Sequence, residues 1–182
     1  MVAEKIDLEI VTPKGRALAV AVDEVTAPSV DGEFGVLPGP LPVVAAVRTG
    51  IVTYRSGHES TRVAVGPGFA EAGPERLVIL TDDFADREHL DPVILRKDLA
   101  DVQEKLAALE AVPLVSPGAA GGEASGVDAR AQRDVLVAKE NWIAAQLELY
   151  GDPPPATQRP YEEYGPPAPP AEDEVANGGG SE

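Results

Sequence analysis

Apolar and polar residues alternate along much of the first half of the chain, a pattern typical of half-buried β-strands. Residues 6–10 alternate apolar side chains with acidic ones, and residues 18–22 alternate larger apolar side chains with alanines. Two runs, 50–55 and 61–65, flank a Ser-Gly-His turn and predict a hairpin, and another strand is expected at 77–80 after a Gly-Pro turn. Short strands separated in this way predict a small antiparallel sandwich or barrel.

The apolar period changes to that of a helix between residues 91 and 150. Asp91 is a suitable N-cap before Pro92, and a seam with spacings of four and three follows: Leu95, Leu99, Val102, Leu106 and Leu109. A second seam, with Asp128 as its expected cap and Gly151 as its end, has the same spacings: Ala131, Val135, Ala138, Trp142, Ala145 and Leu149. We expect two antiparallel helices that bury these seams against each other, joined by a flexible linker over 112–127.

Composition separates a third region from the other two. Residues 151–182 carry seven acidic and one basic side chain together with eight prolines, which predicts a disordered acidic, Pro- and Gly-rich tail. The chain is therefore expected to have an α+β fold, with an antiparallel β-sandwich at 1–90, a two-helix antiparallel hairpin at 91–150, and this tail. The whole chain has 15 Lys and Arg against 31 Asp and Glu, a net charge of −16. This charge argues against binding to nucleic acid or directly to an anionic membrane surface.

Residues able to carry chemistry are few. The chain has no cysteine and only two histidines, His58 and His89, so we expect no thiolate or His-based metal site. Gly66-Pro67-Gly68 lacks the Lys and Ser/Thr of a phosphate-binding loop and is interpreted as a turn. Asp82-Asp83 has no companion base or third acid at a telling spacing, so we predict neither catalysis nor a cofactor. The apolar stretches are too short to span a bilayer and the N-terminus is acidic, which predicts a soluble, cytosolic chain.

Four stretches agree with one family in order and spacing. They are Leu-Glu-Ile-Val-Thr-Pro at 8–13, Val-Thr-Ala-Pro-Ser-Val-Asp-Gly-Glu-Phe-Gly-Val-Leu-Pro-Gly at 25–39, Val-Gly-Pro-Gly-Phe-Ala-Glu at 65–71 and Leu-Val-Ile-Leu-Thr-Asp at 77–82. Together they resemble the epsilon subunit of F-type (proton-translocating) ATP synthases. The resemblance implies a flattened sandwich of two small antiparallel sheets, followed by two antiparallel helices, in a subunit that catalyses no bond chemistry.

The resemblance also implies partners. In this family the sandwich lies at the foot of the central stalk, against the gamma shaft and the membrane-embedded c-ring, and turns with them as proton flow drives ATP synthesis. The chain would then meet the membrane only through the complex, on the cytoplasmic face of the bacterial inner membrane. Carried over to this sequence, the residues facing the c-ring and gamma are Asp31, Gly32, Glu33, Phe34, Gly39 and Pro40. Pro40 stands where the family usually has a histidine.

The hairpin of many bacterial members undocks and blocks ATP hydrolysis, which implies the catalytic beta subunit as a further partner. The basic residues that could form such a regulatory face here are Arg130, Arg133 and Lys139. Acidic residues lie among them and an acidic tail follows, so we expect any inhibition to be weak or sensitive to salt.

Some members bind ATP through an Ile/Leu-Asp-x-x-Arg run in the hairpin. Leu90-Asp91 matches its start, but Ile94 occupies the arginine position, and Arg96 is two residues late, about 200° around a helix. We therefore predict no tight ATP site.

Two other classes of protein remain as alternatives. The first is a free-standing β-sandwich module that binds a protein or a glycan and dimerises through its helices. The second is a small hydrolase that uses Asp82 or Asp83 with a metal ion.

Overall fold

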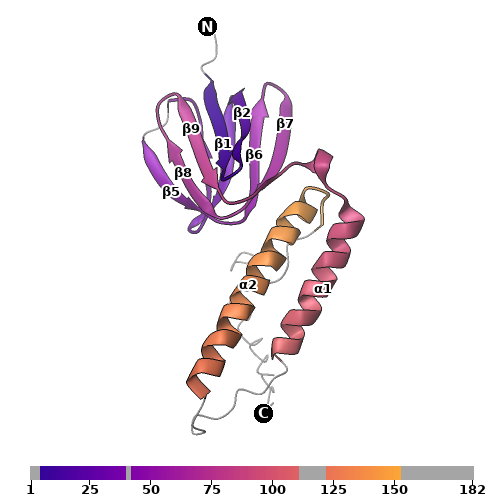
Figure 1. Ribbon diagram of the computed structural model, residues 1–182. Helices are drawn as coiled ribbons and strands as arrows, with labels where there is room; N and C mark the ends of the chain where they lie inside the picture. Colours follow the sequence, from indigo (N-terminus) through magenta and orange to yellow (C-terminus); the bar gives the residue numbers. More distant parts are fainter. Residues whose placement is uncertain (1–4, 40–41, 111–121, 153–182) are drawn as a thin grey trace, which may run out of the picture.

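The computed structural model describes residues 5–39, 42–110 and 122–152 (Figure 1). Its elements, in chain order, are β1 (Ile6–Thr12), β2 (Gly15–Val22), β3 (Glu24–Ser29), β4 (Gly32–Val36), β5 (Val43–Val47), β6 (Gly50–Ser56), β7 (Glu59–Val65), β8 (Gly68–Ala72), β9 (Arg76–Thr81), β10 (Phe84–Ala85), the 3-10 helix η1 (Arg87–His89), α1 (Pro92–Glu110) and α2 (Gly122–Glu148). The expected β-sandwich followed by two helices is confirmed. The predicted acidic tail lies, beyond Asp152, outside the described residues.

The strands of the described residues form one sheet that curls over itself. Its order is β10-β7-β6-β3-β5-β8-β9-β1-β2, with β4 paired to β3 outside this path. Every neighbouring pair is antiparallel except β1 and β9, which run parallel. Because β2 at one end comes into contact with β6 near the other, two layers face each other across a common core (Figure 1). The edges of β2 and β7 are not hydrogen-bonded to each other, which leaves an open seam in the sandwich.

The alternation read from the sequence places the core between these layers. Ile6, Leu8 and Ile10 are at most 1% exposed, whereas Asp7 between them faces solvent. Leu18 and Val20 of β2, which pair with Ile10 and Leu8 in the same layer, pack against the same core. Burial of each such aliphatic side chain contributes about 1.5–3 kcal/mol relative to exposure, so this cluster is the main stabilising element of the sandwich.

The Gly66-Pro67-Gly68 segment is a tight connection between β7 and β8, as predicted. Thr81 Oγ1 donates to the Gly66 carbonyl oxygen at 3.0 Å, and the Asp82 amide donates to the Pro67 carbonyl oxygen at 3.1 Å. A Cβ at position 68 would lie 1.9 Å from the Leu80 carbonyl oxygen. Only glycine fits this close approach of two backbones.

The first helical seam forms as predicted from Leu95 to Leu106. The Asp91 carboxylate accepts the Val93 amide at 2.9 Å and so caps α1. Leu95, Leu99, Val102 and Leu106 pack in one cluster against α2. Figure 1 shows α1 and α2 side by side as an antiparallel hairpin that projects from the sandwich.

The second predicted seam does not pack against α1. The residues of α2 that face α1 are Leu136, Ile143 and Leu147, and Glu140 lies among them, 5% exposed, accepting a hydrogen bond from Gln103 at 3.0 Å. This polar residue interrupts the apolar series in the sequence, which is why the pattern indicated the wrong face.

The predicted seam instead divides between two environments. Trp142, Ala145 and Leu149 pack on Ala64 of the sandwich, whereas Val135 is 68% exposed. The C-terminal third of α2 is therefore apolar on two sides, one for each packing partner.

The start of α2 also differs from the prediction. The helix begins at Gly122, so Asp128 lies within it rather than capping it, and residues 122–127 of the expected linker over 112–127 are helical. Residues 112–121 of that linker lie outside the described residues. The glycines at 122 and 126 suggested a loop, but each costs only about 1 kcal/mol in a helix that packing stabilises.

Candidate functional site

A row of apolar side chains crosses the outer face of the sandwich. Val11 of β1 is opposite Leu80 of β9, Leu80 is opposite Phe69 of β8, and Phe69 is opposite Ala46 of β5. Residues opposite each other share a face, and their neighbours Ile79 and Ala70 are buried, so this row points outward. We call Val11, Ala46, Phe69 and Leu80 the apolar row.

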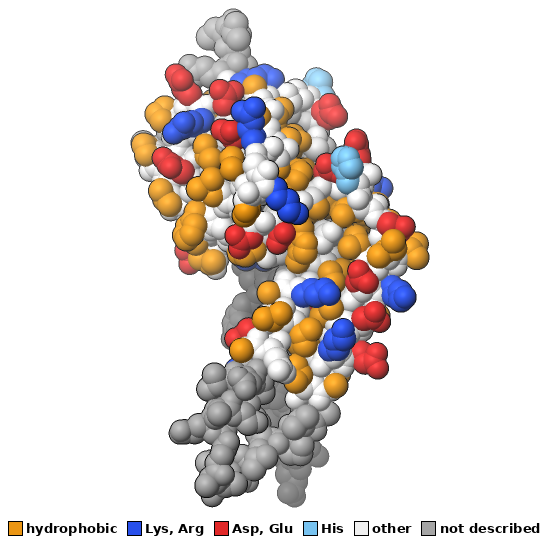
Figure 2. Space-filling model, viewed as in Figure 1, with side chains coloured by type: hydrophobic (Ala, Val, Ile, Leu, Met, Phe, Trp, Pro, Cys, Tyr) orange, Lys and Arg blue, Asp and Glu red, His pale blue; other side chains and the backbone are white. Residues whose placement is uncertain are grey.

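The apolar row is unusually exposed for its chemistry. Phe69 is 61% and Leu80 53% accessible, and Val44 beside the row is 71% accessible. Figure 2 shows hydrophobic side chains gathered over the part of the sandwich that contains β5, β8 and β9. A hollow of about 550 Å³ opens next to Phe69 and Leu80 and is bounded by Pro13 and Pro67. A contiguous apolar surface with an adjoining hollow is typical of a protein interaction site.

The predicted partner-facing turn is the tip of the β3–β4 hairpin. Ser29 pairs with Gly32, so Val30 and Asp31 form a two-residue loop. The Asp31 amide donates to Ser29 Oγ at 3.2 Å, and Gly32 follows with a φ of 124°, a left-handed conformation that favours glycine. The carboxylates of Asp31 and Glu33 both face solvent, so the tip presents negative charge.

The other residues predicted for this site have different surroundings. Phe34 is partly buried and packs against the sandwich core, where it anchors the hairpin. Gly39 is exposed in the segment after β4. Pro40 lies outside the described residues.

The tip and the apolar row are neighbours. The Val30 amide donates to the Ala46 carbonyl oxygen at 3.1 Å, which joins the tip to the β5 end of the row. Val30 itself is 64% exposed. The apolar row and the acidic tip therefore form adjoining parts of one surface.

A polar clamp fastens the end of α2 to the sandwich and to α1. Arg62 of β7 forms an ion pair with Glu148, with Nη2 and Oε1 2.8 Å apart. The Tyr150 hydroxyl lies 2.7 Å from the Arg87 carbonyl oxygen, to which it donates, and the Arg87 guanidinium stacks 5.0 Å from the Tyr150 ring centre. These contacts tie the hairpin to the connector between β10 and α1.

The same clamp includes a two-bond ion pair across the helix ends. Arg96 Nε and Asp152 Oδ2 are 2.9 Å apart, and Arg96 Nη2 and Asp152 Oδ1 are 3.1 Å apart. The hydrogen bond and charge of Arg96 lower the pKa of Asp152, and the carboxylate in turn raises the pKa of Arg96. Arg96, two residues beyond the arginine position of the ATP-binding run, is thus engaged within the chain.

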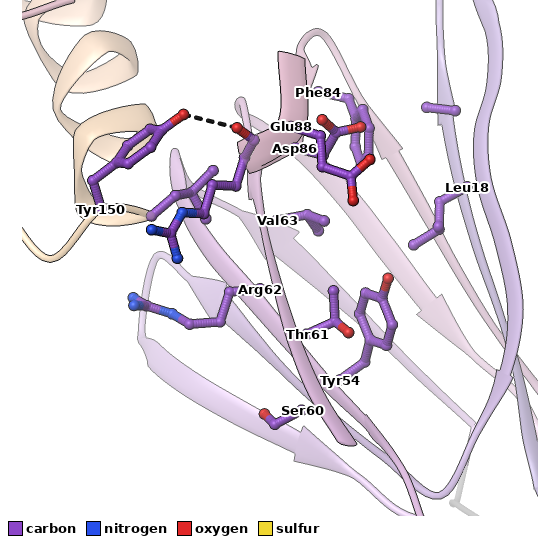
Figure 3. A pocket seen from close by; sticks show the side chains of 13 residues that line it. Leu18, Tyr54, Ser60, Thr61, Arg62, Val63, Phe84, Asp86, Glu88 and Tyr150 are labelled. Atoms are coloured by element: carbon purple, nitrogen blue, oxygen red, sulfur yellow. Dashed lines mark hydrogen bonds between the residues drawn. The ribbon is translucent and has the colours of Figure 1, made fainter. Parts of the chain in front are cut away.

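The open seam forms a second hollow, of about 690 Å³, beside this clamp. Figure 3 shows Leu18, Tyr54 and Phe84 directed into it. Its rim is polar and is made by residues of β7, the connector and the end of α2: Ser60, Thr61, Arg62, Asp86, Arg87, Glu88 and Tyr150. Burial is the main cause that raises the pKa of Tyr54, and the nearby carboxylates act in the same direction, so its hydroxyl stays protonated.

His89 has a local partner at the start of the hairpin. Its Nδ1 lies 2.6 Å from Asp86 Oδ1, and the same carboxylate accepts the His89 amide at 3.1 Å. The hydrogen bond to Asp86, together with its charge, raises the pKa of His89. His58, by contrast, is exposed in the β6–β7 turn.

The three basic residues predicted for the hairpin face do not share one side of α2. Arg130, Arg133 and Lys139 are all exposed. At about 100° per residue, Arg130 and Lys139 lie on opposite sides of the helix. A common regulatory face is therefore not formed by all three.

In the part of the chain that the structure describes, no group of three His, Cys, Asp or Glu side chains could hold a metal ion. No helix among the described residues is long and apolar enough to cross a membrane.

The sequence did not indicate the apolar row. Its members come from four strands, and they become neighbours only through the sheet register. The one local signal is the run at 77–80, in which apolar residues occupy outward as well as inward positions.

Comparison with known proteins relates the chain to ATP synthase epsilon chains. A family model described as the β-sandwich domain of the ATP synthase delta/epsilon chain matches residues 5–87. The chain is 34% identical over 107 residues to ATP synthase epsilon chain 2 of Syntrophotalea carbinolica, covering 59% of this chain and 78% of that protein. It is 38% identical over 104 residues to the ATP synthase epsilon chain of Anaeromyxobacter sp. (strain K), a match that covers 57% of this chain and 79% of that protein.

A solved structure is similar in fold. One chain in the cryo-EM structure of the Euglena gracilis mitochondrial ATP synthase, OSCP/F1/c-ring in rotational state 1, matches with a TM-score of 0.58 and 23% identity. The match covers 81% of this chain and 84% of that chain. At this identity the likeness supports the fold.

Proposed function

Because the chain belongs to the epsilon-chain family of ATP synthases, we propose that it is a non-catalytic subunit of the central stalk. In this proposal it binds the gamma shaft and the c-ring and turns with them, so that proton translocation is coupled to ATP synthesis. It lies at the cytoplasmic face of the bacterial inner membrane and is held there by the complex.

The observation that carries the proposal is the apolar row with its adjoining hollow. A rotor subunit needs a rigid body and surfaces for two partners rather than a pocket for a substrate. Phe69 and Leu80 project from a continuous sheet, so force applied to them passes to the whole sandwich. Apolar anchors beside a hollow are suited to a shaft that carries its own apolar side chains. We assign the apolar row to gamma.

The acidic tip of the β3–β4 hairpin is assigned to the c-ring. Asp31 and Glu33 are exposed and adjoin the apolar row through Val30 and Ala46. A pair of carboxylates on a short, hydrogen-bonded turn suits the polar loops of a membrane ring, where it would pair with basic side chains.

We assign to the helical hairpin a weak regulatory effect on ATP hydrolysis. In the docked position it is held by the polar clamp and by a small apolar contact in which Ala64 and Ala145 are the buried small residues. Its basic residues are spread around α2, and this scatter limits attraction to an acidic surface of the beta subunit. We expect no tight ATP site because Arg96 is paired with Asp152.

Cross-linking in the assembled complex tests the assignment of the tip. The chain has no cysteine, so a cysteine placed at Asp31 is unique, and its partner cysteine is placed in the polar loop of the c subunit. Oxidation is expected to join D31C to the c subunit. The matched control is E59C at the start of β7, next to the β6–β7 turn. Because Glu24 at the start of β3 pairs with Arg55 near that turn, Glu59 lies at the other end of the β3–β6 pair from the tip.

The cross-linked products show whether the tip of the β3–β4 hairpin faces the c-ring. A product with D31C and none with E59C supports the proposal. Equal products from both positions, or a product with E59C alone, would contradict the orientation. Failure of the purified chain to enter the complex at all would contradict the stalk function itself.

A further inference from the structure

The hollow in the open seam of the sandwich has no role in the stalk function proposed above. It lies between the starts of β2 and β7, beside the connector and the end of α2 (Figure 3). Its floor includes Leu18, Tyr54 and Phe84, side chains that are packed against the core yet only partly covered. An apolar floor with convergent polar groups at the rim is the usual character of a binding site. At about 690 Å³ the hollow is large enough for one or two aromatic side chains.

The rim offers both signs of charge. Arg62 and Arg87 supply guanidinium groups, and Asp86 and Glu88 supply carboxylates. The Arg62 side chain stays 43% exposed even in its ion pair with Glu148. An occupant that combines aromatic hydroxyls with carboxylates would satisfy both kinds of group, since hydroxyls donate to carboxylates and carboxylates accept from arginines.

The sequence beyond Asp152 contains a segment of this chemistry. Aromatic residues make up only 4% of the chain, and it has four tyrosines in all. Two of these four, Tyr161 and Tyr164, lie three residues apart and flank Glu162 and Glu163. The rest of residues 153–182 contains no Phe, Trp or Tyr, so this is the one place there where aromatic surface is concentrated.

The end of the described chain at Asp152 lies close enough to the hollow for this tyrosine segment to reach it. Tyr150 lines the rim of the hollow, and Asp152 is fixed two residues later by Arg96. Residues 153–161 span up to about 30 Å when extended, and the three prolines at 153–155 favour an extended start. Reaching the hollow from Asp152 therefore requires only part of the available length.

From these observations we propose that residues 160–164 of the same chain dock in the seam hollow. The rings of Tyr161 and Tyr164 lie on the floor formed by Leu18, Tyr54 and Phe84, and the two glutamates face the arginines of the rim. Because the hollow is bounded by both the sandwich and Tyr150, the docked segment would bridge the sandwich and the hairpin. Docking therefore stabilises the arrangement in which the hairpin lies against the sandwich.

A spin-label experiment on the full chain tests this docking. The natural absence of cysteine allows one label at S60C, on the exposed rim of the hollow, and amide signals are followed by NMR. We expect the amides of residues 161–164 to lose most of their intensity, whereas residues 172–174 keep theirs. The matched control is a label at E71C on the outer face of β8, which is exposed and does not line the hollow.

A mixed sample identifies the source of any broadening. Isotope-labelled chain without a spin label is combined with spin-labelled chain at natural abundance. Broadening in this mixture, where the spin label and the detected amides are on different chains, would mean that the segment docks on a second copy, and it would overturn the proposal. Equal broadening from S60C and E71C, or none from either, would overturn it as well.

Hydrogen exchange gives an independent readout without a label. In the full chain, Y161A/Y164A is expected to increase exchange of the rim amides at residues 60–63 by about tenfold, which corresponds to roughly 1.4 kcal/mol. The control E172A/E174A alters the same region of sequence without removing an aromatic ring and is expected to leave these rates unchanged. Identical rates in both variants and in the parent chain would contradict docking. Because these substitutions lie outside the sandwich and hairpin, the outcome does not depend on whether the chain binds gamma.

Discussion

Removing the two most exposed large side chains of the apolar row is expected to weaken binding to the gamma subunit strongly. Full burial of a Phe or Leu side chain is worth about 1.5–3 kcal/mol. Phe69 is 61% and Leu80 53% exposed in the free chain, so a partner that covers them gains about half to two thirds of that value at each position. The double variant F69A/L80A should therefore lose about 2–3 kcal/mol, or about 30- to 140-fold in Kd.

Isothermal titration with purified gamma subunit measures this loss directly. The control is V93A/I94A, which removes two side chains of comparable exposure, 71% and 58%, from the first turn of α1. It is expected to bind gamma like the parent chain. Both double variants should keep nearly the parent's free energy of unfolding, because the deleted atoms are mostly in water already. A change below about threefold for F69A/L80A, or an equal loss in the control, would refute the assignment of the apolar row.

Three further outcomes are expected. G68A should lower the free energy of unfolding by about 3 kcal/mol or more in a urea titration, because its Cβ would collide with the Leu80 carbonyl oxygen; an unfolding midpoint equal to the parent's would contradict the close approach. The pKa of His89, followed by NMR, should lie above 6.5 and fall in D86N. Since the folded chain holds this proton more tightly than the unfolded chain, the pair stabilises the fold fully below pH 6.5, and the contribution is lost as the pH rises through the raised pKa; an unchanged pKa in D86N would contradict the contact. Deletion of residues 91–182 should raise ATP hydrolysis by the assembled complex less than about tenfold, equivalent to roughly 1.4 kcal/mol, and a larger rise would mean a strongly inhibitory hairpin.

Local pattern predicted the parts of the fold in which one face of an element has one partner. Ile6, Leu8 and Ile10 alternate cleanly because β1 buries a single face. The seam that includes Leu95 and Val102 is likewise regular because one face of α1 packs on α2. The cap at Asp91 follows from short-range hydrogen bonding that the sequence makes visible.

The pattern failed where an element has two partners. The C-terminal third of α2 contacts both α1 and the sandwich, so neither of its faces has a regular series. Glu140 is buried among the residues that face α1, and its hydrogen bond to Gln103, which offsets the cost of burial, depends on the tertiary structure. Strands such as β3 and β5 were not predicted from periodicity, because their short runs lack a clear alternation.

The candidate site was predictable only in part, for the same reason. The tip at Asp31 and Gly32 is continuous in sequence and was found through family resemblance. The apolar row is assembled from four strands by the register, including the parallel pairing of β1 with β9 that joins Val11 to Leu80. Such a surface exists only once the sheet is formed.

Co-elution with the gamma subunit of the source organism's ATP synthase is the most direct test of the stalk function. The full chain and gamma are mixed and separated by size-exclusion chromatography with light scattering. We predict a complex with the mass of one copy of each. Separate elution at tens of micromolar, with the chain running as a homodimer, would contradict the stalk function and would favour a free-standing binding module.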